Sequence, residues 1–192
     1  MSLRSEQPRD HAAVASVHRS AFGADHGDTV VRLVEALRRD DPSALSLVAD
    51  EEAGDVVGHV MVSRAWLDAP RRLVDVQSLS PLAVRPQFQR RGLGAALIRA
   101  ALLHLNERGV PLVFLEGDPR YYSRHGFRPA GEHGFGKPSL RIPDAAFQVV
   151  RLSAYEPWMT GTFVYPSTFW EYDCVGLREA AHDQAESASG AG

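Results

Sequence analysis

The chain has 192 residues, of which 44% are hydrophobic and 23% are charged, and its formal net charge is −3. These values predict one globular domain and exclude a largely disordered chain or a protein that binds nucleic acid through overall positive charge. The single cysteine, Cys174, excludes an internal disulfide and a multi-cysteine zinc site. Neither a run of about 18 apolar residues nor a leader pattern is found, so the expected location is the cytoplasm, with no membrane partner.

The first half of the sequence predicts two helices followed by antiparallel strands. Residues 2–5 suit a short strand, and apolar spacing predicts helices over 8–21 and from Asp28 or Thr29 to 39, separated by a loop at 22–27. Alternation predicts a hairpin of strands at 45–50 and 56–66, then a long strand at 73–84. The alternation slips around Ser80 and Pro81. Because proline cannot donate to a strand ladder, this slip indicates a bulge or an exposed edge.

A basic loop with two glycines joins that long strand to the next helix. Residues 89–94 (QRRGLG) place consecutive backbone N–H groups at a helix start, where no intrahelical carbonyl accepts them and the helix dipole adds positive potential. Gly92 and Gly94 let a ligand approach the backbone, and Arg90 and Arg91 add charge. The segment predicts a pyrophosphate site. The alternative is an ordinary helix start with its arginines in solvent.

The second half predicts a parallel strand pair and an aromatic C-terminal segment. The helix after the loop ends before Gly109, and the apolar run at 110–115 predicts a buried strand, so strand, helix and strand form a locally parallel pair in a mixed sheet. A short helix is expected at 120–125, a strand at 127–130 and the last core strand at 146–154. Aromatic residues between 156 and 175 indicate a packed flap or an extra hairpin. We expect one domain over 1–178, with 155–178 packed on it, and a disordered tail at 179–192.

This order of elements, together with two motifs, resembles the GNAT superfamily of acyl-CoA-dependent N-acyltransferases over residues 3–154. The motifs are QRRGLG at 89–94 and YSRHGF at 122–127. The step GDP at 117–119 before two tyrosines is similar to the YhbS-like bacterial branch. The resemblance implies an α/β (α+β) fold: a mixed, mostly antiparallel central sheet with a bulged and splayed strand pair and helices on both faces.

The resemblance also implies an activity and a set of site residues. Acetyl-CoA would be the cosubstrate, no metal would take part, and a primary amine would attack the thioester directly in a ternary complex. Tyr122 matches the general acid of the family, since a phenol with a pKa near ~10 is protonated at neutral pH. Tyr121 should point to another face of its helix. The residues expected to bind coenzyme A are Leu82, Ala83, Val84, Gln89, Arg90, Arg91, Gly92, Leu93, Gly94, Ala95 and Asp118.

Two positions depart from the family pattern. Ser78 stands where many members carry a glutamate that deprotonates the amine, so the sequence names no base; Glu116, Asp25 and His26 remain candidates. Leu115 stands where an asparagine is frequent, and Asp118 is the nearest polar replacement.

Other interpretations of the same residues are weaker. GLGAAL at 92–97 nearly matches a dinucleotide-binding fingerprint, with Glu116 about twenty residues on, but residues 85–91 separate the strand from the first glycine and no second half follows. A non-catalytic acyl-CoA sensor or assembly subunit is the other alternative. The eight histidines show no paired ligand spacing, and Cys174 is expected to be a small buried hydrophobe. The acceptor, a small-molecule or protein amine, stays open, as do the acyl length and the oligomeric state, a homodimer included.

Overall fold

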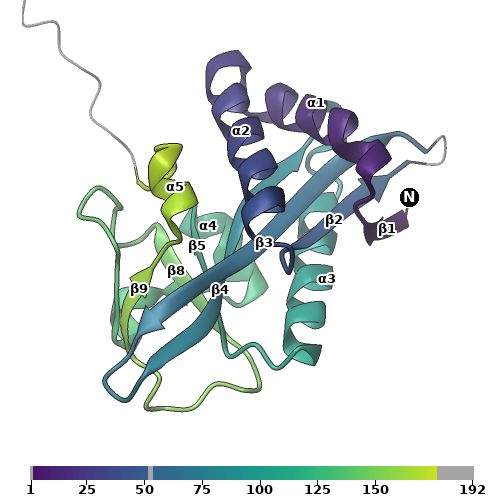
Figure 1. The fold of residues 1–192 in the computed structure, drawn as a ribbon. Coiled ribbons are helices and arrows are strands. Elements are labelled where there is room, and N and C mark those ends of the chain that lie inside the picture. The colour runs from purple at the N-terminus through teal and green to yellow at the C-terminus, as the bar shows by residue number, and fades with distance from the viewer. Residues whose placement is uncertain (1, 52–53, 177–192) are drawn as a thin grey trace, which may run out of the picture.

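The computed structural model describes residues 2–51 and 54–176 and is built on one sheet (Figure 1). Within these residues the sheet has nine strands, seven of them in the order β1-β2-β3-β4-β5-β8-β6, while β9 pairs with β3 and β7. The strands are β1 (Ser2–Ser5), β2 (Leu45–Asp50), β3 (Val56–Asp68), β4 (Leu73–Val84), β5 (Leu112–Glu116), β6 (Arg128–Pro129), β7 (Phe135–Gly136), β8 (Phe147–Arg151) and β9 (Gly161–Val164).

Helices cover both faces of this sheet. α1 and α2 lie on one face and α3 on the other, each over its own apolar cluster (Figure 1). The cluster beneath α1 and α2 also takes in the C-terminal aromatic residues, whereas the cluster beneath α3 holds the opposite side chains of the same strands. The helices are α1 (His11–Phe22), α2 (Ala24–Asp40), α3 (Leu93–Glu107), α4 (Pro119–Tyr122) and α5 (Ser167–Glu171), with 3-10 turns η1 (Pro8–Asp10), η2 (Pro86–Phe88), η3 (Ser123–His125) and η4 (Ala130–His133).

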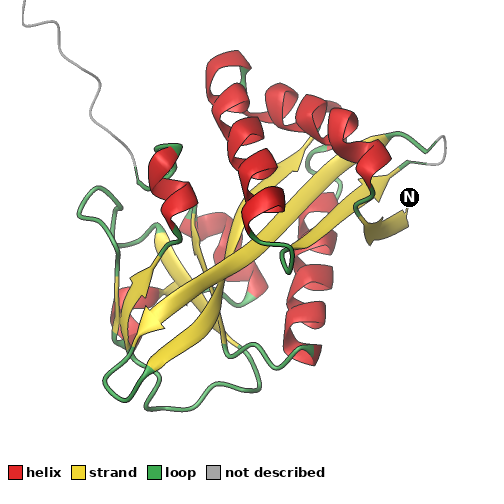
Figure 2. Cartoon of the chain, viewed as in Figure 1, coloured by secondary structure: helices red, strands yellow, loops and turns green. Residues whose placement is uncertain are grey.

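The sheet is mostly antiparallel, as predicted. β3 and β4 are the longest strands and cross the whole molecule (Figure 2). β4 and β5 are parallel because α3 carries the chain from one end of β4 back to the start of β5. A dinucleotide-binding protein needs a doubly wound parallel sheet, so this topology rules out that alternative.

A bulge interrupts β4 where the sequence indicated it. Val60 of β3 pairs with Leu82, but Val62 pairs with Leu79, so the chain around Ser80 and Pro81 is longer than the segment opposite. β4 lies between β3 and β5, which makes the feature a bulge and not an edge.

Beyond the bulge, β4 and β5 part from each other. Their ladder contains only the pairs Gln77 with Val113 and Ser78 with Phe114, whereas β5 continues to pair with β8 as far as Glu116. The bulged and splayed strand pair is therefore present.

The predicted loop at 22–27 is wrong. α1 ends at Phe22 and α2 already begins at Ala24, so only Gly23 separates the helices. Gly23 takes φ 82°, a backbone conformation that favours glycine, and donates its N–H to the Arg19 carbonyl where α1 ends. Gly27 then lies inside α2 in close contact with α1, since an added Cβ would be 2.7 Å from the Arg19 Cα. Asp28 does not start the helix; its carboxylate pairs with Arg19 at 2.6 Å.

The aromatic C-terminal segment forms the strand β9 followed by the helix α5. We had expected a packed flap or an extra hairpin. β9 pairs antiparallel with the C-terminal end of β3, with Trp66 opposite Val164 and Asp68 opposite Thr162. Tyr165 then stacks on Phe169 of α5 at 4.4 Å between ring centroids. This packing joins the segment to the main core. Residues 177–192, including the predicted tail, lie outside the described residues, so the domain boundary stays a prediction.

Candidate active site

A groove of about 660 Å³ lies where the end of β4, the start of α3 and α4 meet. Most of the residues predicted to hold a cofactor share this groove, although they come from separate elements. It is lined by Leu82, Val84, Gln89, Arg90, Gly92, Leu93, Gly94, Ala95, Tyr121, Tyr122, Arg124 and His125.

One end of the groove is built as an anion cradle. Gly92 takes φ 82° and caps α3. Arg90, two residues earlier, also has a positive φ, of 60°. The first intrahelical bond runs from the Ala96 N–H to the Gly92 carbonyl, so the N–H groups of residues 93–95 have no acceptor within the helix. Gln89 fixes the loop to the strand by donating its side-chain amide to the Val84 carbonyl at 2.9 Å. Unpaired N–H groups and the helix dipole suit a phosphate.

Three of the predicted cofactor residues lie outside the groove lining. Ala83 is buried on the opposite face with the α1 and α2 cluster. The Arg91 guanidinium lies over the Phe88 ring at 5.5 Å. Asp118 caps α4 by accepting from the Arg120 N–H at 2.9 Å, and its hydrogen bond to the Arg120 side chain lowers the pKa of the Asp118 carboxyl. A direct contact of these three side chains with coenzyme A stays a prediction.

Tyr122 is held firmly at the groove. Its ring packs on Gly117, where an added Cβ would be 2.3 Å from the Tyr122 Cε2, and lies edge-on to Phe127 at 5.8 Å. Among the described residues the Tyr122 hydroxyl has no hydrogen-bond partner. Burial raises the pKa of this phenol above its ordinary value. The hydroxyl is therefore protonated at neutral pH and available to donate.

Sequence reasoning missed Tyr121, Arg124 and His125 as groove residues. α4 is a single turn, so the rings of Tyr121 and Tyr122 both reach the groove, 5.0 Å apart and nearly perpendicular. We expected Tyr121 to point to another face of the helix, but both tyrosines line the same groove. The Tyr121 hydroxyl lies over Gly94, close enough that a Cβ there would be 2.5 Å from it. Only the packing of α4 beside the start of α3 creates this contact.

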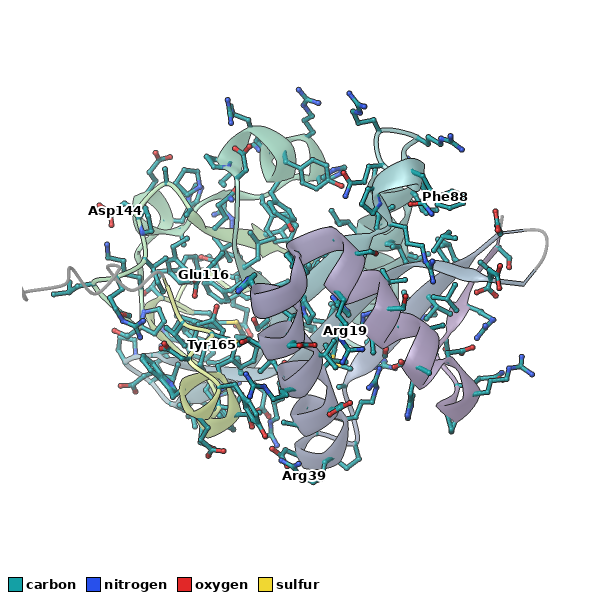
Figure 3. The ribbon with its side chains drawn as sticks, turned by 90° about the horizontal axis from the view of Figure 1, so that it is seen from above. Arg19, Arg39, Phe88, Glu116, Asp144 and Tyr165 are labelled. Carbon is teal, nitrogen blue, oxygen red and sulfur yellow. The ribbon has the colours of Figure 1, made fainter. Side chains whose placement is uncertain are left out.

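Ser78, Glu116 and His26 are all absent from the groove lining. Ser78 is fully buried in β4, and His26 is exposed in α2, where its ring meets Phe22. The Asp25 side chain lies outside the described part of the structure. Glu116 ends β5, and its carboxylate accepts from the Tyr165 hydroxyl at 2.9 Å and the Gly176 N–H at 3.0 Å (Figure 3).

Two buried histidines form a separate polar pair under α1. His18 Nε2 and His59 Nδ1 are 2.8 Å apart, and His59 Nε2 meets the Ser46 hydroxyl at 2.8 Å. Burial lowers the pKa of both imidazoles to about 3, so both are neutral at pH 7. The Cys174 thiol is partly buried, which raises its pKa to about 11.

The described residues show neither a metal-binding cluster nor a membrane-spanning helix. They include no cluster of three or more histidine, cysteine, aspartate or glutamate side chains that could hold a metal ion. None of their helices is both long and apolar enough to cross a membrane.

Sequence comparisons identify relatives of this chain. A family profile described as an acetyltransferase (GNAT) domain matches residues 42–129. Two Escherichia coli K12 relatives are each named as an uncharacterized N-acetyltransferase. YjhQ is 37% identical over 160 residues, which cover 79% of this chain and 84% of the relative. YhbS is 35% identical over 155 residues, which cover 80% and 88%.

Solved structures agree with the sequence comparison. The crystal structure of E. coli YhbS in complex with CoA has a TM-score of 0.78 at 32% identity, covering 88% of this chain and 91% of that one. A GNAT family acetyltransferase from Brucella melitensis in complex with acetyl-CoA has a TM-score of 0.69 at 30% identity, covering 88% and 97%. With the same fold and substantial identity over most of its length, the chain belongs to the GNAT family of acyl-CoA-dependent N-acetyltransferases.

Proposed function

We propose that this protein transfers the acetyl group of acetyl-CoA to a primary amine by direct attack, with Tyr122 protonating the departing thiolate. The observation that carries the proposal is the groove, in which an anion cradle and a protonated tyrosine hydroxyl face the same space.

The cofactor would lie along this groove. Its pyrophosphate would take the N–H groups of residues 93–95, with Arg90 adding positive charge. Its pantetheine arm would follow residues 82–84, where β4 no longer pairs with β5. The CoA and acetyl-CoA in the two related crystal structures support this assignment.

The reaction needs three events at the thioester. The amine nitrogen attacks the carbonyl carbon, the carbon–sulfur bond breaks, and the thiolate takes a proton. The oxygen that becomes negative would be held by a backbone N–H at the splayed strand. Tyr122 can supply the proton because burial keeps its phenol neutral at working pH and its hydroxyl has no other acceptor among the described residues.

The test is a thiol-release assay with acetyl-CoA and a panel of small amines, amino-acid derivatives and peptides with free amines. We expect turnover with at least one class and a kcat about 10²- to 10⁴-fold lower for Tyr122→Phe, with the Kd for CoA within about twofold of wild type. Tyr155→Phe removes a phenol hydroxyl outside the groove lining, so it is the control and should keep kcat. Unchanged kcat in Tyr122→Phe would overturn the acid role, and binding of CoA with no turnover on any amine would favour a sensor.

A further inference from the structure

We propose that Glu116 binds the acceptor amine and removes its proton, and that the segment 161–176 positions this carboxylate. The inference deepens the proposed function and rests on it. It assigns to β5 the base that β4 lacks, since β4 carries no acidic residue from Val76 to Val84.

Glu116 stands at the edge of the gap between the splayed strands. The ladder between β4 and β5 ends at Phe114, two residues earlier, while β8 still pairs with Glu116 on the other side. Side chains alternate along a strand, so Glu116 shares the face of Phe114, which packs in the α1 and α2 cluster. Figure 3, which looks onto the face that carries α1 and α2, shows Glu116 beside Tyr165.

The cofactor groove opens on the opposite face. Its apolar lining, Leu82, Val84 and Leu93, packs with the α3 cluster. A thioester that enters the gap from the α3 side would therefore present its carbonyl carbon to an amine arriving from the α1 and α2 side. Glu116 is the carboxylate at that end of β5.

The C-terminal segment holds this carboxylate without neutralising it. Oε1 accepts from the Tyr165 hydroxyl and Oε2 from the Gly176 N–H, which leaves each oxygen a further lone pair. In the described part of the chain no cation pairs with Glu116 within 4.0 Å; Arg141 acts on it only at longer range and instead pairs with Asp173 at 3.6 Å. A carboxylate without a paired cation suits a positively charged amine.

Other titratable groups around Glu116 come from the same segment. They are Tyr165, held protonated because burial raises its pKa, and Cys174, whose pKa is also raised. Ser78 lies near the Tyr165 phenol and lowers its pKa, although outside regular hydrogen-bond geometry. Burial raises the pKa of Glu116 above its usual value, which makes it a stronger base than an exposed glutamate.

The proton balance is complete. Glu116 takes one proton from the bound ammonium group and passes it to solvent. The free amine forms the carbon–nitrogen bond as the carbon–sulfur bond breaks. The second proton lost from nitrogen balances the one that Tyr122 gives to the thiolate, so each turnover releases amide, CoA thiol and one net proton.

The test compares kcat/KM across pH for wild type, Glu116→Gln and Tyr165→Phe, with thermal unfolding measured alongside. Glu171→Gln, an exposed carboxylate of α5, is the control and should match wild type. We expect Glu116→Gln to lower kcat/KM by about 10²- to 10⁴-fold with the Kd for CoA unchanged. Tyr165→Phe keeps the carboxylate but loses a bond that favours its charged form, so the acid limb of the profile should move to higher pH.

The outcomes separate the two proposals. If Glu116 only anchors the segment 161–176, Tyr165→Phe will lower the unfolding temperature but leave the acid limb of the pH profile where it is in wild type. That result overturns the inference, even if Glu116→Gln fails to fold. An active wild type with an unchanged Glu116→Gln overturns the role of Glu116 alone. A wild type that binds CoA but acetylates no amine overturns the proposed function itself, and the base with it.

Discussion

Gly94→Ala tests the anion cradle because stability and cofactor affinity should respond differently. Gly94 is the second residue of α3, and an added Cβ would lie 2.5 Å from the Tyr121 hydroxyl and 3.9 Å from the Val84 side chain. The Tyr121 ring is 36% exposed and can swing aside. Alanine favours a helix over glycine by up to about 1 kcal/mol, so we expect an unfolding free energy equal to that of wild type or slightly higher.

Affinity should fall because the methyl group occupies the space above the backbone N–H. A hydrogen bond to a charged group contributes about 1.5–3 kcal/mol. Loss of that bond to the pyrophosphate corresponds to a Kd about 10- to 150-fold higher. Tyr121→Phe in the same variant relieves the clash with the hydroxyl but leaves the methyl in the cradle, so affinity should not return.

Isothermal titration with acetyl-CoA, together with thermal unfolding, measures both quantities. Gly131→Ala is the matched control, since an added Cβ there meets no atom within 4 Å and the residue lies outside the groove lining. It should bind acetyl-CoA as wild type does. A folded Gly94→Ala protein with a Kd within twofold of wild type would refute the cradle.

Two further predictions concern the packing around the site. His18 and His59 have folded pKa values of about 3, below about 6.5 for unfolded chains, so the unfolding free energy should fall by about 1.4 kcal/mol per pH unit per histidine as pH drops below ~6.5. Urea titrations at pH 7, 6 and 5 measure this slope, and an undiminished slope in His18→Phe would contradict it. Gly161→Ala places a methyl 2.1 Å from the Asp68 carbonyl at φ +143°, so urea unfolding should show a loss of about 3 kcal/mol; a loss below about 1 kcal/mol would mean that β9 shifts freely along β3.

Local sequence predicted most elements and the cradle. The periodic spacing of apolar residues in a strand or helix is a local property of the sequence. The first N–H groups of any helix lack intrahelical acceptors, so a helix that starts at QRRGLG has them wherever it lies in the fold. Ser80 and Pro81 indicated the bulge for the same reason, because proline lacks a donor wherever it lies.

Local sequence failed where distant segments compete with local signals. Asp28 is a good helix cap by residue type, yet it pairs with Arg19 and lies inside α2, because Gly23 alone makes the turn and Gly27 lets the helices touch. Helical spacing placed Tyr121 on another face of its helix than Tyr122. It could not show that the start of α3 packs against Tyr121 and so brings both rings to one groove.

The composition, the succession of elements and the glycine loop that starts α3 were thus readable from the sequence alone, while the coenzyme A contacts and the acid role of Tyr122 stay predictions. Only the tertiary structure brought Glu116 together with Tyr165, which is 49 residues away along the chain, and only the parting of β4 from β5 set that carboxylate at the gap. Such contacts arise from long-range packing, and no spacing rule within a single strand or helix encodes them.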